Sequence, residues 1–354
     1  MTTTTASWMI SPSDTGRFFR PAFGVLLGAL VMTGCAQFRG LDNRAGQNTA
    51  PERATAAVIR GPIPRPNSAL RAARAHRIAL EARAAERAAN TPASQTMHSY
   101  FEGVEDMLIA RGQLRRDDGN TIPLTVEKLT QDFIAIALYD EYTRNGSELV
   151  AGARPSRLRR WGQPVQVAVE FGASVTPATR TRDRAEVHSF SERLARLTGH
   201  DIAVTPGSGN FTVLFLSEDE RRRIGNRLQN IVPGIPSVDI ESIQSLPPQN
   251  YCTVFAYSLG SSPLYSDAVA IIRAELPPRL RSSCIHEELA QGMGLANDSP
   301  EAIPSIFNDD EEFALLTRHD ELLLRILYDP RLRPGMTEEE ATPIVRKIAR
   351  ELLE

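Results

Sequence analysis

The chain has 354 residues, of which 42% are apolar and 23% charged, and its formal net charge is -3. These proportions are ordinary for a soluble globular protein. The charge is unevenly distributed, because residues 1–98 hold 12 Arg and 5 acidic residues, whereas residues 99–354 hold 28 basic and 38 acidic residues. The body of the chain is therefore acidic. Because it has no basic patch with interleaved aromatic residues, we expect no nucleic-acid partner.

The N-terminus has the features of an export signal. Arg17 and Arg20 precede an apolar run, Ala22–Met32. This run is shorter than the roughly 20 residues of a membrane span, but it has the length of a signal-peptide core with a positive flank. We expect residues 1–34 to be a signal peptide that begins at Met1 or at Met9. An uncleaved anchor helix is the alternative.

A cysteine follows the apolar run in a pattern that predicts lipidation. The sequence Met32-Thr33-Gly34-Cys35 resembles a bacterial lipobox, in which the cysteine is acylated and becomes the new N-terminus. Several acyl chains on one residue anchor a protein stably, which a single chain does not. In bacterial lipoproteins an Asp after the cysteine tends to retain the protein at the inner membrane, whereas Cys35 is followed by Ala36. We therefore expect a lipid-anchored protein of the cell envelope, at the periplasmic face of the outer membrane.

A tether separates this anchor from the body of the protein. Residues 36–66 are rich in Gly, Pro, Asn, Arg and Ala, a composition that cannot bury enough apolar surface to order itself. Residues 68–89 are almost all strong helix formers with few large apolar groups, which predicts an exposed helix that stops near Pro92. We expect the lipidated N-terminus and tether to cover residues 35–98 and the globular domain to cover residues 99–354.

The globular domain alternates predicted helices and strands. Apolar residues at helical or alternating spacing, with turn residues between them, carry these predictions. The predicted helices cover 125–143, 181–199, 218–229, 278–293, 310–329 and 337–354. The predicted strands cover 164–172, 201–205, 210–217, 251–258 and 266–276. Gly207–Asn210 is predicted as a hairpin turn, and Asn308–Asp310 as the cap of a helix that begins near Glu311. The order predicts an α/β or α+β single domain with a mixed, twisted sheet, a long motif helix and C-terminal helices.

The helix predicted over 278–293 carries a spaced set of polar residues. From Glu287 to Asp298 the sequence reads E-E-x-x-Q-x-x-G-x-x-N-D. This resembles the metzincin zinc-peptidase signature, H-E-x-x-H-x-x-G-x-x-H/D. In that signature positions i and i+4 share one helical face and hold a metal. The glutamate between them polarises the metal-bound water, and the glycine lets the chain turn back to supply a third ligand.

The resemblance assigns roles to four residues. Glu287, Gln291 and Asn297 stand at the ligand positions, and Glu288 stands at the position of the catalytic base. A carboxylate with two amides is a poor zinc set, and it suits Ca²⁺ or Mg²⁺ better. We therefore expect no cofactor, with zinc or another divalent cation as the alternative. His286 lies roughly 100° around the helix from this face and does not replace a missing ligand.

Two later segments extend the resemblance, which covers roughly residues 160–330. Residues 299–309 lie where metzincins place a tight turn under the metal, with Phe307 at the methionine position. Asp320–Tyr328 resembles the closing helix of that fold. The chain is closer still to a group of exported bacterial proteins known only as a domain of unknown function, which share a similar pattern, C…EELAQ..GL.ND…S.FNDD…D..L…LYD…GM. A metzincin-like fold is the expectation that follows.

Three functions remain open on this reasoning. The leading expectation is a lipid-anchored envelope protein whose degenerate metallopeptidase-like domain binds a peptide, protein or glycan without cleaving it. The alternative is an active metallopeptidase with atypical ligands and Glu288 as general base. The third is a structural envelope protein that merely keeps an ancestral fold.

The cysteine count predicts a disulfide. The chain has 3 Cys, and lipidation of Cys35 leaves only Cys252 and Cys284 in the processed chain. Export places them in an oxidising compartment, where an unpaired pair of thiols is unusual. We expect the two to be bonded, with two separate buried thiols as the alternative.

Overall fold

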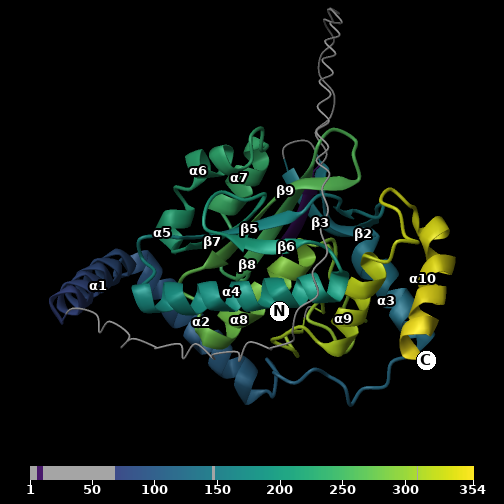
Figure 1. Cartoon of the computed structure of the whole chain (residues 1–354), viewed down its shortest axis with the longest axis horizontal. Coiled ribbons are helices and arrows are strands. Elements are labelled where there is room, and N and C mark those ends of the chain that lie inside the picture. Colours follow the sequence, from purple (N-terminus) through teal and green to yellow (C-terminus); the bar gives the residue numbers. More distant parts are fainter. Residues whose placement is uncertain (1–5, 11–67, 146–147, 309) are drawn as a thin grey trace, which may run out of the picture. The chain divides into compact units, whose positions relative to one another are not determined.

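The computed structural model describes residues 6–10, 68–145, 148–308 and 310–354 (Figure 1). The predicted signal-peptide core, the lipidation site Cys35 and the tether over residues 36–66 lie outside the described residues. Among the helices that the structure describes, none combines the length and the apolar character needed to cross a bilayer.

A mostly parallel sheet forms the centre of the domain. Its strands follow the order β1-β8-β9-β7-β5-β6, and β4 pairs with β9. The pairs are all parallel except β8 with β9, which are antiparallel. The strands are β1 (Ala6–Ile10), β4 (Arg160–Trp161), β5 (Val165–Phe171), β6 (Ile202–Thr205), β7 (Phe211–Leu216), β8 (Cys252–Ser258) and β9 (Leu264–Arg273). Every residue of β7 and β8 is buried, which explains their continuous apolar runs.

Helices cover both faces of this sheet. Because side chains alternate along a strand, Val254 and Ala256 join the core cluster that includes α4 (Pro177–Thr198) and α8 (Pro278–Gln291). Phe255 and Tyr257 join a second cluster with α6 (Gly225–Ile231) and α7 (Ser237–Gln244). Figure 1 shows α4 and α8 on one side of the sheet and α6 and α7 on the other. The domain is therefore a layered α/β structure, which confirms the expected fold class.

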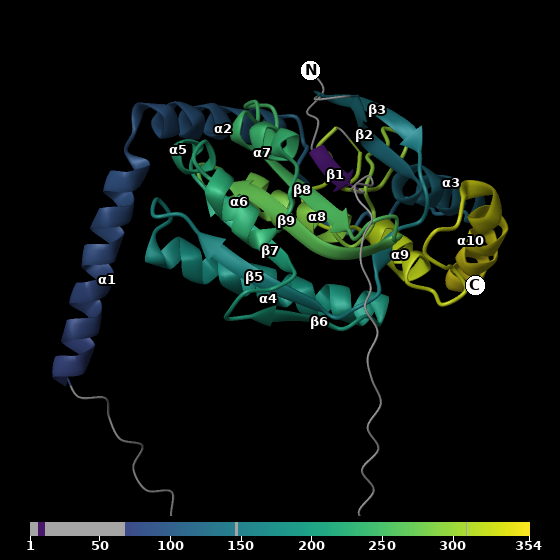
Figure 2. The same ribbon diagram turned by 90° about the horizontal axis from the view of Figure 1, so that it is seen from above.

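The structure describes further elements outside these layers. They are α1 (Ser68–Ala89), α2 (Pro92–Ala110), α3 (Val126–Ala137), α5 (Glu218–Arg221), α9 (Arg318–Leu327), α10 (Glu338–Leu353) and the antiparallel hairpin β2 (Tyr139–Asn145) with β3 (Glu148–Pro155). Helices α3, α9 and α10 contact one another and lie together beside the sheet (Figure 2).

The predicted hairpin between β6 and β7 is wrong. The two strands do not pair with each other, because both lie parallel to β5, one on each side of it. The chain crosses β5 so closely at Gly209 that an added Cβ would lie 1.9 Å from the carbonyl oxygen of Gln166. Only glycine tolerates such an approach. Gly207–Asn210 therefore belong to a crossover connection from β6 to β7, not to a hairpin turn.

Three predicted helices differ from the structure: the helix predicted over residues 218–229 is divided into two short helices, Glu218–Arg221 and Gly225–Ile231, and two others are shorter than expected. No helix begins at Glu311, whose φ is +57°, so Asn308–Asp310 do not cap one, and Asp309 itself lies outside the described residues. Helix α9 instead begins at Arg318, after a capping box between Thr317 and Asp320. The helix predicted over residues 125–143 ends at Ala137, and the chain then enters β2.

Candidate functional site

The motif helix α8 is buried along most of its length. From Ser283 to Gln291 no residue is more than 8% exposed. Pro278 lies in the first turn of α8, where backbone N–H groups have no partner within the helix, so the N–H that proline lacks costs no hydrogen bond. The predicted helix is confirmed, and its polar side chains lie inside the protein rather than on a solvent face.

A disulfide ties α8 to the sheet. Cys284 is bonded to Cys252 at the start of β8, with 5.8 Å between the two Cα atoms. That separation lies inside the ordinary range for a disulfide. The predicted pairing is confirmed, and it fixes the motif helix against β8.

The glycine at the exit of α8 is required by the backbone. Gly294 has a φ of +123°, and an added Cβ would lie 2.4 Å from the carbonyl oxygen of Arg159. Beyond it the chain turns back, and the N–H groups of Ala296 and Asn297 both donate to the carbonyl of Ile136 in α3, at 3.0 Å. The sharp exit implied by the motif is therefore present.

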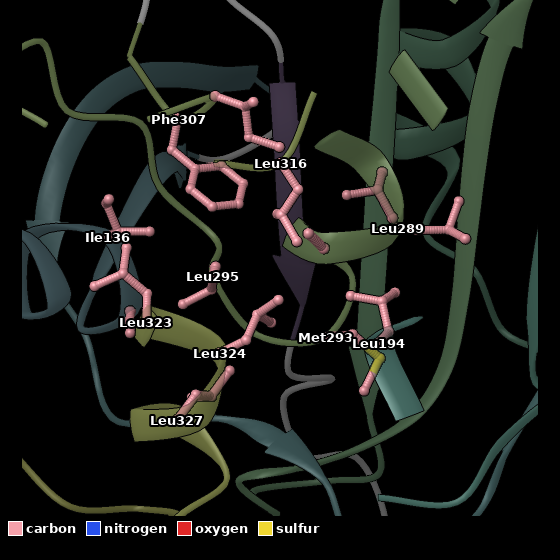
Figure 3. Close-up of a cluster of buried hydrophobic side chains, with 14 of the residues drawn as sticks. Ile136, Leu194, Leu289, Met293, Leu295, Phe307, Leu316, Leu323, Leu324 and Leu327 are labelled. Atoms are coloured by element: carbon pink, nitrogen blue, oxygen red, sulfur yellow. The ribbon is translucent and has the colours of Figure 1, made fainter. Parts of the chain in front are cut away.

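The exit packs into the main hydrophobic core. Leu289, Met293 and Leu295 lie in the same buried cluster as Phe307 and Leu316 (Figure 3). Phe307, which the resemblance places at the methionine position, is fully buried. Apolar packing therefore holds the segment around the motif in place.

The four motif side chains are buried, but their contacts differ from one another. Glu287 is 7% exposed, Asn297 4%, and Glu288 and Gln291 are fully buried. The side-chain amide of Gln291 donates to Asp298 Oδ1 at 3.0 Å. The amide of Asn297 instead donates to a backbone carbonyl of α3 at 2.8 Å. That Glu287, Gln291 and Asn297 converge at one cleft, with Glu288 beside them, stays a prediction.

A pair of carboxylates lies at the disulfide. One ligand atom each of Cys252, Glu287 and Glu288 lies within 4.8 Å of the other two. The sulfur of Cys252 is part of the disulfide, so it is not the thiolate that binds metals. Two carboxylates remain, which are fewer than the four ligands of a zinc site or the six to eight oxygens around Ca²⁺. These residues by themselves do not fit a zinc centre.

His286, one position before this pair, has a structural role. Its Nδ1 accepts the N–H of Leu316 at 3.1 Å, and its ring stacks on Phe190 with 4.0 Å between centroids. Burial lowers the pKa of His286 to about 3, and the charge of Arg193 adds to this effect. His286 is therefore neutral at physiological pH and holds the segment before α9, consistent with its expected place off the ligand face.

A buried ion cluster that sequence reasoning missed lies between α3 and α9. His319 Nε2 lies 2.9 Å from Asp132 Oδ2, and His319 Nδ1 lies 3.6 Å from Asp320 Oδ1. Burial lowers the pKa of His319, but the two carboxylates beside its ring outweigh this effect, so the pKa is raised. Asp320 also accepts from Ser305 Oγ and from Thr317, so it holds the segment that precedes α9. Only a spatial arrangement reveals this cluster, because Asp132 is far from His319 in sequence.

Residues 126–347 match a family described as protein of unknown function (DUF2927). The chain belongs to this family. The DUF2927 range includes α3, the β2–β3 hairpin, every strand of the main sheet except β1, and the motif helix α8. No curated protein and no solved structure matches the chain. The family therefore covers the whole candidate site and assigns it no activity.

Proposed function

We propose that this DUF2927 protein is a lipid-anchored component of the cell envelope whose metzincin-like domain binds an extended peptide and does not cleave it. The lipid anchor rests on the lipobox-like Cys35. The binding role rests on the edge of the main sheet, and the lack of cleavage rests on the residues at the motif positions.

The observation that carries the proposal is the pairing of β8 with an extended segment. β1 lies parallel to β8 in a register that runs from Ala6 opposite Thr253 to Ile10 opposite Tyr257. Removal of residues 1–34 as a signal peptide takes β1 away, and β8 then becomes the edge strand of the sheet. An edge strand offers main-chain donors and acceptors to a further strand, which is a common mode of peptide recognition.

The peptide seat, which is β8 from Thr253 to Tyr257, begins beside the acidic pair Glu287 and Glu288. Thr253, the first residue paired with β1, directly follows Cys252, whose sulfur lies within 4.8 Å of carboxylate oxygens of Glu287 and Glu288. The two carboxylates at this point favour a peptide with a positive charge near its first paired residue. A peptide with a negative charge at this point would be repelled, so the acidic pair would select between peptides by their charge.

The motif positions support binding without hydrolysis. A zinc peptidase needs a metal to polarise the carbonyl and to activate water. In this chain the three ligand positions carry Glu287, Gln291 and Asn297, and a carboxylate with two amides is a poor set of ligands for zinc. Glu288 at the base position would then have no metal-bound water to deprotonate.

The test uses the processed protein in detergent and a labelled peptide that corresponds to residues 4–12 of the chain. Fluorescence anisotropy should show saturable binding, because this peptide contains the segment that β8 seats. The same peptide N-methylated at alternate amides cannot form the strand ladder, so its affinity should fall by about tenfold or more. Mass spectrometry should recover the peptide intact after long incubation.

Different failures separate the parts of the proposal. Equal affinity for the N-methylated peptide would rule out strand pairing on β8. Cleavage of the peptide that Glu288→Gln abolishes and Glu339→Gln leaves unchanged, together with stoichiometric zinc, would establish a peptidase instead. Glu339 is a suitable control because it is exposed on α10.

A further inference from the structure

A second candidate site lies at the carboxyl edge of the parallel strands. Ser174, Ser217 and Glu275 follow β5, β7 and β9 within one to three residues. Because these strands are parallel neighbours, their ends meet at one edge of the sheet. A cavity of about 220 Å³ opens there, and Ser94 and His98 of α2 contribute to its lining. In open parallel sheets this edge is where ligands usually bind.

Glu275 places an oxygen without a partner at this cavity. The residue is 6% exposed, and its Oε1 accepts from Ser94 Oγ at 2.6 Å and from the N–H of Glu218 at 2.7 Å. Its Oε2 is shielded from solvent and has no hydrogen-bond partner among the residues that the structure describes. Burial raises the pKa of the Glu275 carboxyl, because it disfavours the charged form. A ligand that donates to Oε2 would satisfy a group that is otherwise costly to bury.

Two other lining groups, Ser94 and Ser174, also have accepting capacity. A hydroxyl has one hydrogen and two lone pairs. Ser94 gives its hydrogen to Glu275, and Ser174 gives its hydrogen to Glu220 Oε2 at 2.7 Å, so both oxygens are left with accepting capacity. His98 Nδ1 lies 3.0 Å from the carbonyl of Glu275, and because a carbonyl only accepts, this nitrogen is the donor of an internal bond. None of the described residues that line the cavity is Lys or Arg.

We propose that this cavity binds a primary ammonium group, with Glu275 Oε2 as its counter-ion. An ammonium carries three donors and no acceptor, so it complements a cavity that offers acceptors and one carboxylate. The volume is below the roughly 300–1,000 Å³ of pockets for drug-sized ligands, which limits the occupant to a small aliphatic amine or one amino-acid side chain. The cavity shares no lining residue with the motif on α8 or with the strand β8, so this proposal does not rest on the proposed function.

The test is isothermal titration calorimetry of the purified full chain with three probes of similar length. Diaminopentane represents a free amine, Nα-acetyl-lysine amide represents an amino-acid side chain, and pentanediol is the neutral counterpart. At least one amine should bind one-to-one, with an affinity about tenfold or more above that of the diol, because a charged hydrogen bond is lost in the diol. The amine that binds identifies the source of the ammonium group.

Two variants and a control locate the binding. Glu275→Gln keeps the carbonyl oxygen that accepts from Ser94 and Glu218 but turns a donor toward the ligand, so amine affinity should fall by about tenfold or more. Gln95→Phe, at an exposed position of α2 in the lining, fills the cavity and should lower affinity as much without touching the buried carboxylate. Glu339→Gln, the same change on the surface of α10, should leave affinity unchanged. Circular dichroism establishes that each variant is folded.

Three results would overturn the proposal. They are the absence of amine binding at millimolar concentration, equal binding of the diol, and unchanged amine affinity in folded Glu275→Gln or Gln95→Phe.

Discussion

Removal of the disulfide should destabilise the domain by a predictable amount. The bond joins residues 32 apart in sequence, Cys252 and Cys284. In the chain-entropy account, closing a loop of that length stabilises the folded state by roughly 3.7 kcal/mol. Both cysteines are at most 1% exposed, so alanine is the better replacement, because serine would bury two hydroxyls. With a urea m-value of about 3 kcal/mol per molar, the unfolding midpoint should fall by about 1.2 M.

The measurement is urea unfolding of the double alanine variant and of the wild type, followed by fluorescence and by circular dichroism. Wild type reduced with dithiothreitol is the control, because it loses the cross-link and keeps both sulfur atoms. A loss in the double variant that reduction reproduces assigns the effect to the cross-link. If reduction changes the midpoint by less than a quarter of the expected shift, then the bond does not constrain the unfolded chain and the loop argument is wrong.

Three further predictions concern separate parts of the chain. Metabolic labelling with a fatty-acid probe should mark the wild type and not Cys35→Ser, and equal labelling would exclude lipidation there. Gly294→Ala should lower the unfolding free energy by about 1–3 kcal/mol, because the residue would strain at φ +123° and meet the carbonyl of Arg159; an unchanged urea midpoint would contradict this. The pKa of His286 is about 3 in the folded protein and about 6.5 in the unfolded chain. Between these two pH values the unfolded chain binds a proton at this ring and the folded protein does not, so stability falls as the pH falls. The wild type should therefore lose about 1.4 kcal/mol more per pH unit in that window than His286→Gln, and equal slopes would contradict a buried neutral ring.

The sequence predicted those elements whose signals are local. The strands from β5 to β9 are short apolar runs between turn residues, and α8 follows a proline and ends at glycines, so each was recognisable on its own. The bond between Cys252 and Cys284 could also be predicted, because the cysteine count left one pairing once Cys35 was assigned to lipid. Such signals depend on neighbouring residues in the sequence, so they do not change with the packing of the rest of the chain.

Pairing between distant segments could not be predicted in this way. The Gly-rich residues between β6 and β7 resemble a hairpin turn, and nothing local reveals that both strands pair with β5. Likewise, Asn308 and Thr317 are equally good helix caps in sequence, but only Thr317 has its partner Asp320 held by buried contacts. In both cases tertiary contacts choose between local alternatives that are similar in energy.

The candidate site shows the same division. The steric need for Gly294 follows from the motif, and the structure bears it out. The bond between Gln291 and Asp298 was not anticipated, because the metzincin pattern directs attention to Asn297, one residue earlier. The cavity at Glu275 has no motif at all, since its lining residues come from four separate segments that only the parallel sheet gathers.

The two proposed sites lie toward the same edge of the sheet. Because β8 is antiparallel to β9, its first residue Cys252 pairs with Ile272, close to the carboxyl end of β9 where Glu275 follows. A peptide that pairs with β8 as β1 does has its N-terminal end at this edge. Neighbouring strands are about 4.8 Å apart, so such a peptide lies two spacings, or about 10 Å, from β9. An amino terminus that extends a few residues beyond Thr253 could span that distance, since an extended residue covers about 3.3 Å. The acidic pair Glu287 and Glu288 and the carboxylate of Glu275 would then both favour a cationic N-terminal segment, which gives the two sites one common chemistry without requiring a metal.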